Sequence, residues 1–215
     1  MKITLTIIIF LIFLGACSEI PDLQEADILA EANQEAIALG KLDRKLMYGM
    51  FPLYVDAEEE PYTGWTKEID PDTKAKTLGY LKTGRKEGRW ITWAENGTKI
   101  HEAMWAEDRL EGIYLAWYND GLLRVKGQTR DGEMDGRWQE FYPDGKIERN
   151  INNSIGHLVS IQVWKPDGTI CTDSTVTDGN GSYMRYCPDG SLMFKRTFVD
   201  GVETKKEDLS SPMID

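Results

Sequence analysis

Histidine and cysteine are scarce in this sequence, which has two His and three Cys among 215 residues. His101 and His157 have no cysteine or carboxylate at the spacing of a metal site, so we interpret both as surface or loop residues. The sequence also contains no phosphate-binding glycine loop, zinc-ligand spacing or nucleophile elbow. Acid pairs such as Asp131 and Glu133 are typical of solvated turn tips. We therefore expect a non-catalytic protein without cofactor or metal.

Basic residues are in deficit, with 25 Lys and Arg against 36 Asp and Glu, which gives a formal net charge of −11. A field of this sign repels nucleic acid and anionic lipid head groups. The balance therefore disfavours any role that depends on binding DNA or RNA.

Long apolar runs are absent except at the amino terminus, where Ile3 to Leu14 follow Lys2. A positive start and a short apolar run are typical of a secretory signal, and the run is too short to span a bilayer comfortably. It ends in Leu14-Gly15-Ala16-Cys17, which resembles the bacterial lipobox. The resemblance implies that residues 1–16 are removed and that Cys17 is acylated, which would hold the protein on a membrane. The alternative is an ordinary signal peptide with an incidental cysteine.

Residues 17–61 are expected to form the anchor, a helix and a linker. Asp22 and Glu25 resemble a capping box, and apolar residues then recur at helical spacing as far as Leu46. This pattern predicts a helix over about 22–47. Because its first half is acidic, we expect it to pack on the following domain or act as a spacer rather than bind lipid. Residues 50–61 are expected to be a connector.

The rest of the chain is a repeat. Its units close with glycines at 97, 121, 145, 168 and 190, at steps of 24, 24, 23 and 22 residues. The unit reads Gly-x-aromatic-x-x-aromatic-x-x-(Asp/Asn)-Gly, as in Gly136-Arg-Trp138-Gln-Glu-Phe141-Tyr-Pro-Asp-Gly145. The copy at 146–168 departs most from this pattern. A period of this length indicates an array of stacked units.

Each unit carries two turn signals, one at the closing Asn-Gly or Asp-Gly and one midway between closing glycines. Two turns per period leave two strands of about seven to nine residues. We therefore predict a mainly β fold, an antiparallel β-meander of repeated hairpins with ten or eleven strands over residues 62–201 and one N-terminal helix. The residues from 202 to 215 are expected to be a disordered tail.

The aromatic positions predict two columns on opposite faces of this sheet, because residues two apart in a strand share a face. The first column is Trp90, Tyr114, Trp138, Ile161 and Tyr183, and the second is Trp93, Trp117, Phe141, Trp164 and Tyr186. A one-layer sheet cannot cover both columns unaided. Either the helix covers part of one face, or a bulge turns both columns inward, or one stripe stays exposed as a binding surface.

The unit and the Tyr62-Thr-Gly64 segment resemble the MORN-variant repeat proteins of bacteria, a group that includes YwqK-type antitoxins. The likeness covers about residues 62–201 and brings no catalytic residues with it. It implies a repeat fold and only a broad range of functions.

Cys171 and Cys187 flank the turn at 178–181, and their midpoint falls within it. Facing residues of a hairpin have a constant sum of positions, so the two cysteines should lie opposite each other. Outside the cytoplasm this predicts a Cys171–Cys187 disulfide.

The sequence is compatible with three functions. The first is a lipid-anchored envelope protein, in the outer membrane and facing the periplasm or the surface, that presents its sheet to a protein partner. The second is an antitoxin-like or immunity partner that neutralises a cognate toxin. The third is a glycan or peptidoglycan binder that stacks sugars on exposed rings.

Overall fold

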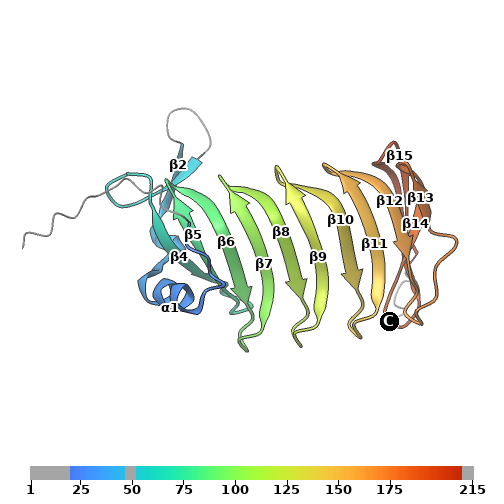
Figure 1. Cartoon of the computed structure of the whole chain (residues 1–215), viewed down its shortest axis with the longest axis horizontal. Helices are drawn as coiled ribbons and strands as arrows, with labels where there is room; N and C mark the ends of the chain where they lie inside the picture. Colours follow the sequence, from blue (N-terminus) through green and yellow to red (C-terminus); the bar gives the residue numbers. More distant parts are fainter. Residues whose placement is uncertain (1–19, 47–51, 210–215) are drawn as a thin grey trace, which may run out of the picture.

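The computed structural model describes residues 20–46 and 52–209, so the signal segment and Cys17 lie outside the described residues. One α-helix and a short 3-10 turn precede a long run of strands (Figure 1). The elements in chain order are α1 (Ala26–Glu35), β1 (Ile37–Ala38), η1 (Leu39–Lys41), β2 (Asp43–Leu46), β3 (Pro52–Val55), β4 (Gly64–Ile69), β5 (Lys76–Lys82), β6 (Arg85–Trp93), β7 (Lys99–Ala106), β8 (Arg109–Trp117), β9 (Leu123–Arg130), β10 (Glu133–Phe141), β11 (Ile147–Ser154), β12 (His157–Val163), β13 (Thr175–Thr177), β14 (Asn180–Tyr186), β15 (Leu192–Val199) and β16 (Val202–Asp208).

The strands from β4 to β16 form one meander in which each strand pairs with the next in the chain, all antiparallel. The predicted fold class is therefore confirmed. The predicted number of strands was low, because residues 62–200 contain the twelve strands β4 to β15. The irregular first unit supplies a full hairpin, β4 and β5.

The turn at each closing glycine has the same geometry in every unit. In the third unit the Gly145 N–H donates to the Tyr142 carbonyl at 2.9 Å, and the Asp144 carboxylate accepts the Lys146 N–H at 3.0 Å. Gly145 has a φ of +81°, which a glycine adopts without strain. The side-chain bond recurs from Asn96, Asp120, Asp167 and Asp189.

The midway turns are joined to each other across units. The N–H of the first turn residue donates to a side chain twenty positions earlier, as Asp131 does to Glu111 at 2.8 Å. The same bond recurs in the pairs Thr83 and Thr63, Glu107 and Glu87, Ile155 and Asp135, and Asp200 and Asn180. We call these five bonds the turn clamps. They were not foreseen, although a polar acceptor stands directly before a glycine in each of these units.

The predicted helix over 22–47 is wrong in its second half. Helix α1 ends at Glu35, and Ile37 and Ala38 then pair parallel with Thr66 and Lys67 on the edge of β4. Its Ala32 and Ala36 pack on one face of the sheet with Trp65, Leu78 and Ile91, whereas Leu39 and Leu42 pack on the other face with Leu81 and Trp90. The segment thus wraps around the first edge of the sheet, and part of the expected connector is strand β3.

The sheet curls on itself at its C-terminal end, where β12 to β15 are seen edge-on in Figure 1. The Leu158 N–H donates to the Gly201 carbonyl at 3.1 Å, although β12 and β16 are four places apart in the sheet. The expected disordered tail is wrong for residues 202–208, which form the edge strand β16. Its Lys and Glu residues are typical of the charged edges that prevent sheets from adding further strands.

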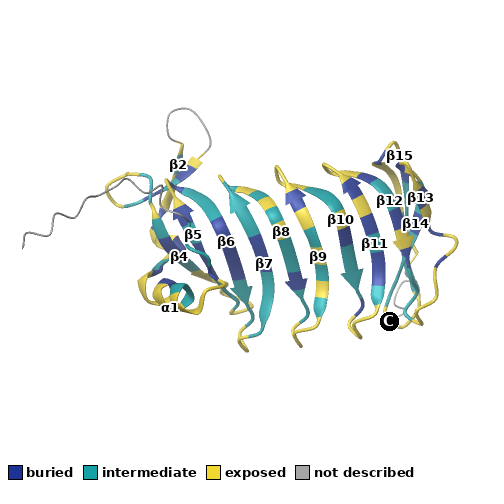
Figure 2. Ribbon diagram, viewed as in Figure 1, coloured by how far each residue is buried: buried dark blue, intermediate teal, exposed yellow. Residues whose placement is uncertain are grey.

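Buried residues form bands across successive strands, and exposed residues gather at the turns (Figure 2). We call the face that carries Trp90, Tyr114 and Trp138 the inner face. The opposite face, which carries Trp93, Trp117 and Phe141, is the outer face. Helix α1 covers only the first strands of the outer face, against Trp65 and Leu78.

Candidate interaction surface

The first aromatic column is part of the core. Trp90, Trp138, Tyr183 and Ile161 are all buried on the inner face, and Tyr114 is partly buried against Trp138, with ring centroids 5.2 Å apart. The rings lie above small residues: a Cβ added at Gly127 would meet the Trp138 ring at 2.2 Å. The inner column therefore stabilises the array and offers little to a partner.

The second column lies on the outer face and is half-buried throughout. Trp93 pairs across the strands with Lys99, and the later rings pair with the apolar residues two positions after the closing glycines, as Trp117 does with Leu123 and Phe141 with Ile147. Packing against α1 covers part of Trp93. We call the remaining rings, Trp117, Phe141, Trp164 and Tyr186, the outer stripe. Of the three expected ways to accommodate both aromatic columns, the structure combines two: the helix covers one end of the outer column, and the rest of that column stays partly exposed.

A lysine lies over the ring face at most positions of the second column. Lys99 Nζ lies 4.7 Å from the Trp117 ring centroid, and Lys126 Nζ lies 5.8 Å from that of Phe141. Lys76 over Trp93 and Lys165 over Tyr186 repeat the arrangement at 5.9 and 5.8 Å. Cation–π contacts of this kind hold each ring and place positive charge beside it. The outer stripe therefore combines aromatic rings with lysines, one of which, Lys99, also pairs with the buried Glu102 at 2.6 Å.

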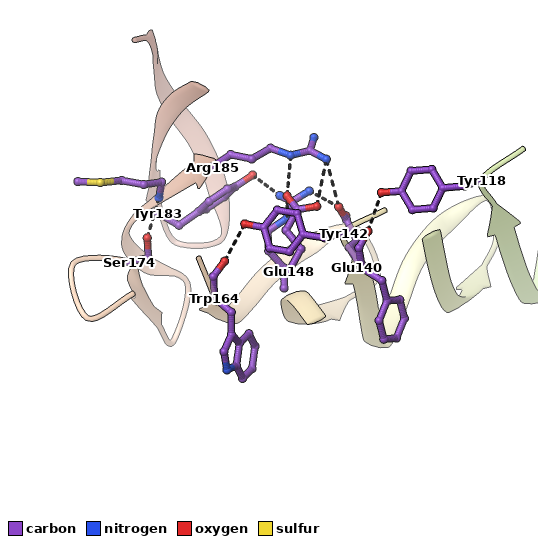
Figure 3. Close-up of polar contacts among 11 residues, drawn as sticks. Tyr118, Glu140, Tyr142, Glu148, Trp164, Ser174, Tyr183 and Arg185 are labelled. Atoms are coloured by element: carbon purple, nitrogen blue, oxygen red, sulfur yellow. Dashed lines mark hydrogen bonds and ion pairs between the residues drawn. The ribbon is translucent and has the colours of Figure 1, made fainter. Parts of the chain in front are cut away.

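Behind this stripe, the inner face carries a charged network that the sequence analysis missed (Figure 3). Arg149 forms ion pairs with Glu140 and Glu148, and its Nη1 donates to the Tyr183 hydroxyl at 3.1 Å. Arg185 Nε donates to Glu148 at 2.7 Å. A bulge where Phe141 pairs with Ile147 lets Glu148 and Arg149 both reach this network although they are adjacent in sequence. The sequence feature that could have indicated this network was the adjacent Glu148-Arg149 pair directly after a closing turn.

Two tyrosines bond one unit to the next at the edge of this network (Figure 3). The Tyr118 hydroxyl donates to the Phe141 carbonyl at 2.7 Å, and the Tyr142 hydroxyl donates to the Trp164 carbonyl at 2.8 Å. Burial, followed by the charge of Glu148, raises the pKa of both tyrosines. These bonds fix the backbone beneath Phe141 and Trp164, so two rings of the outer stripe are held in place from behind.

The structure does not contain the predicted disulfide, and Cys171 and Cys187 are free thiols. The hairpin register pairs Thr177 with Asn180, so Cys171 and Cys187 are one position out of step. The chain also leaves the ladder before Thr175, and the Cys171 Sγ lies 3.2 Å from the Tyr186 hydroxyl instead.

The remaining candidates also have ordinary surroundings. His101 is not a loop residue: it lies in β7 with its ring 4.7 Å from that of Tyr114, and burial lowers its pKa. His157 is exposed at the start of β12. Asp131 forms an ion pair with Arg109 at 3.2 Å. Within residues 20–46 and 52–209, no group of three or more His, Cys, Asp or Glu could hold a metal ion.

No helix in the described part of the chain is long and apolar enough to cross a membrane.

Comparison with known proteins identifies the repeat. The family model of the MORN repeat variant matches residues 134–152. This span contains most of β10, the closing turn at Asp144 and the first part of β11. No curated protein matches the chain.

Proposed function

We propose that this chain is a non-catalytic, lipid-anchored protein of the bacterial envelope that binds a protein partner through the outer stripe. The observation that carries the proposal is the line of half-buried rings on the outer face, each fixed by the sheet beneath it. An extended row of this kind is typical of repeat proteins that bind along their length. The match to the MORN repeat variant supports an interaction module.

The chemistry of the stripe favours a partner that presents carboxylates beside apolar side chains. Aromatic rings supply apolar contact area, and the lysines over them supply positive charge. A glycan binder needs open ring faces for stacking. In this protein Lys99 and Lys126 cover the faces of Trp117 and Phe141, which makes glycan binding the weaker alternative.

The partner experiment is crosslinking in intact membranes, with the double variant Trp117→Ala/Phe141→Ala compared with the wild type. We expect a stoichiometric crosslinked protein that the double variant loses. Val202→Ala, an exposed apolar residue on β16, is the matched control and should retain it. Retention of the protein on purified peptidoglycan, lost in the same double variant, would instead support glycan binding.

The anchor rests on the sequence Leu14-Gly15-Ala16-Cys17. Labelling cells with a radioactive fatty acid should label the wild-type protein and leave Cys17→Ala unlabelled. Cys17→Ala should also leave the membrane fraction. An unlabelled wild-type protein would refute the anchor while leaving the outer stripe to be tested separately. Separation of inner and outer membranes then places the labelled protein, which we propose lies in the outer membrane.

An antitoxin-like role is the alternative, in which the acidic surface of the protein, with its net charge of −11, rather than the outer stripe binds a basic toxin. It requires that deletion of this gene be lethal or harmful while the neighbouring gene is expressed. A healthy deletion strain that still expresses the neighbour contradicts this role.

A further inference from the structure

A cleft of about 660 Å³ lies at the C-terminal end of the inner face, where the sheet curls. Residues of β10 to β12 line it together with residues of β14 to β16. Its walls are partly apolar, with Ile151, Leu158, Phe194 and Phe198 among them. Its volume is within the range of small-ligand sites.

Three residues that line this cleft each have a buried hydrogen-bond donor without a partner. Arg149 Nε, Asn153 Nδ2 and Arg196 Nε are buried and have no hydrogen-bond partner, and all three residues line the cleft. Arg149 and Asn153 are only 6% and 8% exposed. Arg149 Nε lies 3.5 Å from Glu148 without forming a hydrogen bond. In the described part of the chain, the one other such atom is Trp90 Nε1 in the N-terminal half.

The unsatisfied atoms are all donors, which specifies the ligand. Buried N–H groups without partners cost stability, and a ligand that brings acceptor oxygens removes this cost. Arg149 and Asn153 come from β11 and Arg196 comes from β15. A ligand that satisfies these donors must therefore present acceptor oxygens toward both β11 and β15.

The charges of the lining decide whether the ligand is an anion. Three arginines in the lining, Arg149, Arg185 and Arg196, are matched by three carboxylates, Glu133, Glu140 and Glu203. Arg196 donates to Glu203 at 3.0 Å, and Glu140 pairs with both Arg149 and Arg185. Because these charges already balance and the protein carries a net charge of −11, an anion gains little here.

We propose that this cleft binds an uncharged ligand that carries carbonyl oxygens on an apolar body, the chemistry of a short apolar peptide segment. The carbonyl oxygens accept from Asn153 Nδ2 and Arg196 Nε, and the apolar body packs on Phe194 and Phe198. The site lies on the face opposite the outer stripe and is independent of the function proposed for it.

The test uses N-acetylphenylalaninamide as the neutral probe and N-acetylphenylalanine as its anionic analogue, each titrated into the full chain. Nuclear magnetic resonance follows the Asn153 side-chain amide and the Arg196 Nε–H. We expect both signals to shift with the neutral probe, which should bind at least about ten times more tightly than the anionic one. Unshifted signals, or tighter binding of the anion, overturn the proposal.

Two variants separate binding from folding. Asn153→Ala and Arg196→Lys each remove a donor and should weaken binding of the neutral probe about tenfold or more. Arg196 is partly exposed, so Arg196→Lys remains informative if Asn153→Ala fails to fold. Arg109→Lys, in an exposed ion pair on β8, is the matched control. Unchanged binding by a folded Arg196→Lys variant refutes the site, and Trp117→Ala should leave binding intact.

Discussion

At the scale of single residues, the spaces opposite the inner rings determine how closely the strands pack. A Cβ at Gly79 would lie 2.0 Å from the Trp90 ring, and one at Gly127 would lie 2.2 Å from the Trp138 ring. Trp138 cannot easily move away, because its Nε1 donates to the Gln128 carbonyl at 2.8 Å. Where the ring is the smaller Tyr114, its cross-strand partner on β7 is Ala103.

This contact predicts the effect of Gly127→Ala. Because the added carbon overlaps a buried ring, we expect the free energy of unfolding to fall by about 1–3 kcal/mol in urea denaturation. Gly40→Ala is the control, since a Cβ there meets no atom within 4 Å, and its effect should be below about 0.5 kcal/mol. Equal effects of the two substitutions would show that the ring moves freely.

The closing-turn carboxylates predict a dependence of stability on pH. The side-chain hydrogen bond from Thr169 lowers the pKa of Asp167, and that from Ser191 lowers the pKa of Asp189. A carboxylate whose pKa is lower in the folded state than in the unfolded state stabilises the fold above the unfolded pKa of about 3.9. This stability is lost as the pH falls through the pKa of the folded state.

Asp189→Asn keeps the acceptor for the Ser191 N–H but does not titrate, as Asn96 shows in the first copy. Urea midpoints measured between about pH 6 and pH 2.5 should therefore fall less steeply for this variant than for the wild type. Parallel curves would exclude the contribution of Asp189.

At the scale of elements, local signals were sufficient for the repeated hairpins. An Asp-Gly pair such as Asp144-Gly145 adopts its turn through bonds within a few residues, so the sequence alone predicts the hairpin. The end of α1 could not be predicted in this way. Leu39 and Leu42 continue the helical spacing but pack on the face opposite Ala32, which only the edge of the folded sheet determines.

The aromatic columns could also be predicted from local sequence, whereas the charged network could not. Alternation along a strand predicts that Trp138 and Phe141 point to opposite faces, and the structure agrees. The bulge beside Glu148 shifts the register by one residue. Simple alternation therefore could not place Arg149 against Tyr183. The disulfide prediction failed for a similar reason, since a shift of one position separates Cys171 from Cys187.

The turn clamps predict the effect of Glu111→Ala. Loss of the acceptor leaves the Asp131 N–H without its 2.8 Å partner, so its hydrogen exchange should accelerate and stability should fall by about 0.5–1.5 kcal/mol. Glu111→Gln retains an acceptor oxygen and should restore most of the protection. Hydrogen exchange of the Asp178 N–H provides an internal comparison, because the residue twenty positions before it is Leu158, whose side chain has no hydrogen-bond acceptor. Exchange at Asp131 that is unchanged in Glu111→Ala would refute the clamp.

At the scale of the whole molecule, the two ends of the meander are closed in different ways. The N-terminal end is covered on both faces by one wrapped segment, and the C-terminal end closes by curling so that Leu158 in β12 bonds to Gly201 in the turn before β16. Only the outer face between these ends keeps a partly exposed row of rings. The architecture thus places the outer stripe and the cleft on opposite faces of the sheet.

The N-terminal wrap also predicts how the molecule unfolds. In a linear array each strand contacts mainly its neighbours, so damage at one end should stay local. Ala32 is fully buried where α1 meets Trp65 and Leu78, and Ala32→Asp places an unpaired charge in that contact. We expect α1 to detach and hydrogen exchange to accelerate in β4 and β5, whereas β10 to β15 keep their protection.

Ala30→Asp introduces the same charge on the exposed side of α1 and should leave exchange unchanged throughout. Loss of protection along the entire sheet in Ala32→Asp would mean that the array folds as a single cooperative unit. In that case the outer stripe would depend on the wrap, and partner binding would be lost in Ala32→Asp although no ring of the stripe was altered. Retained binding together with local exchange in β4 and β5 would show that the stripe is a self-supporting surface, as its distance along the sheet from α1 implies.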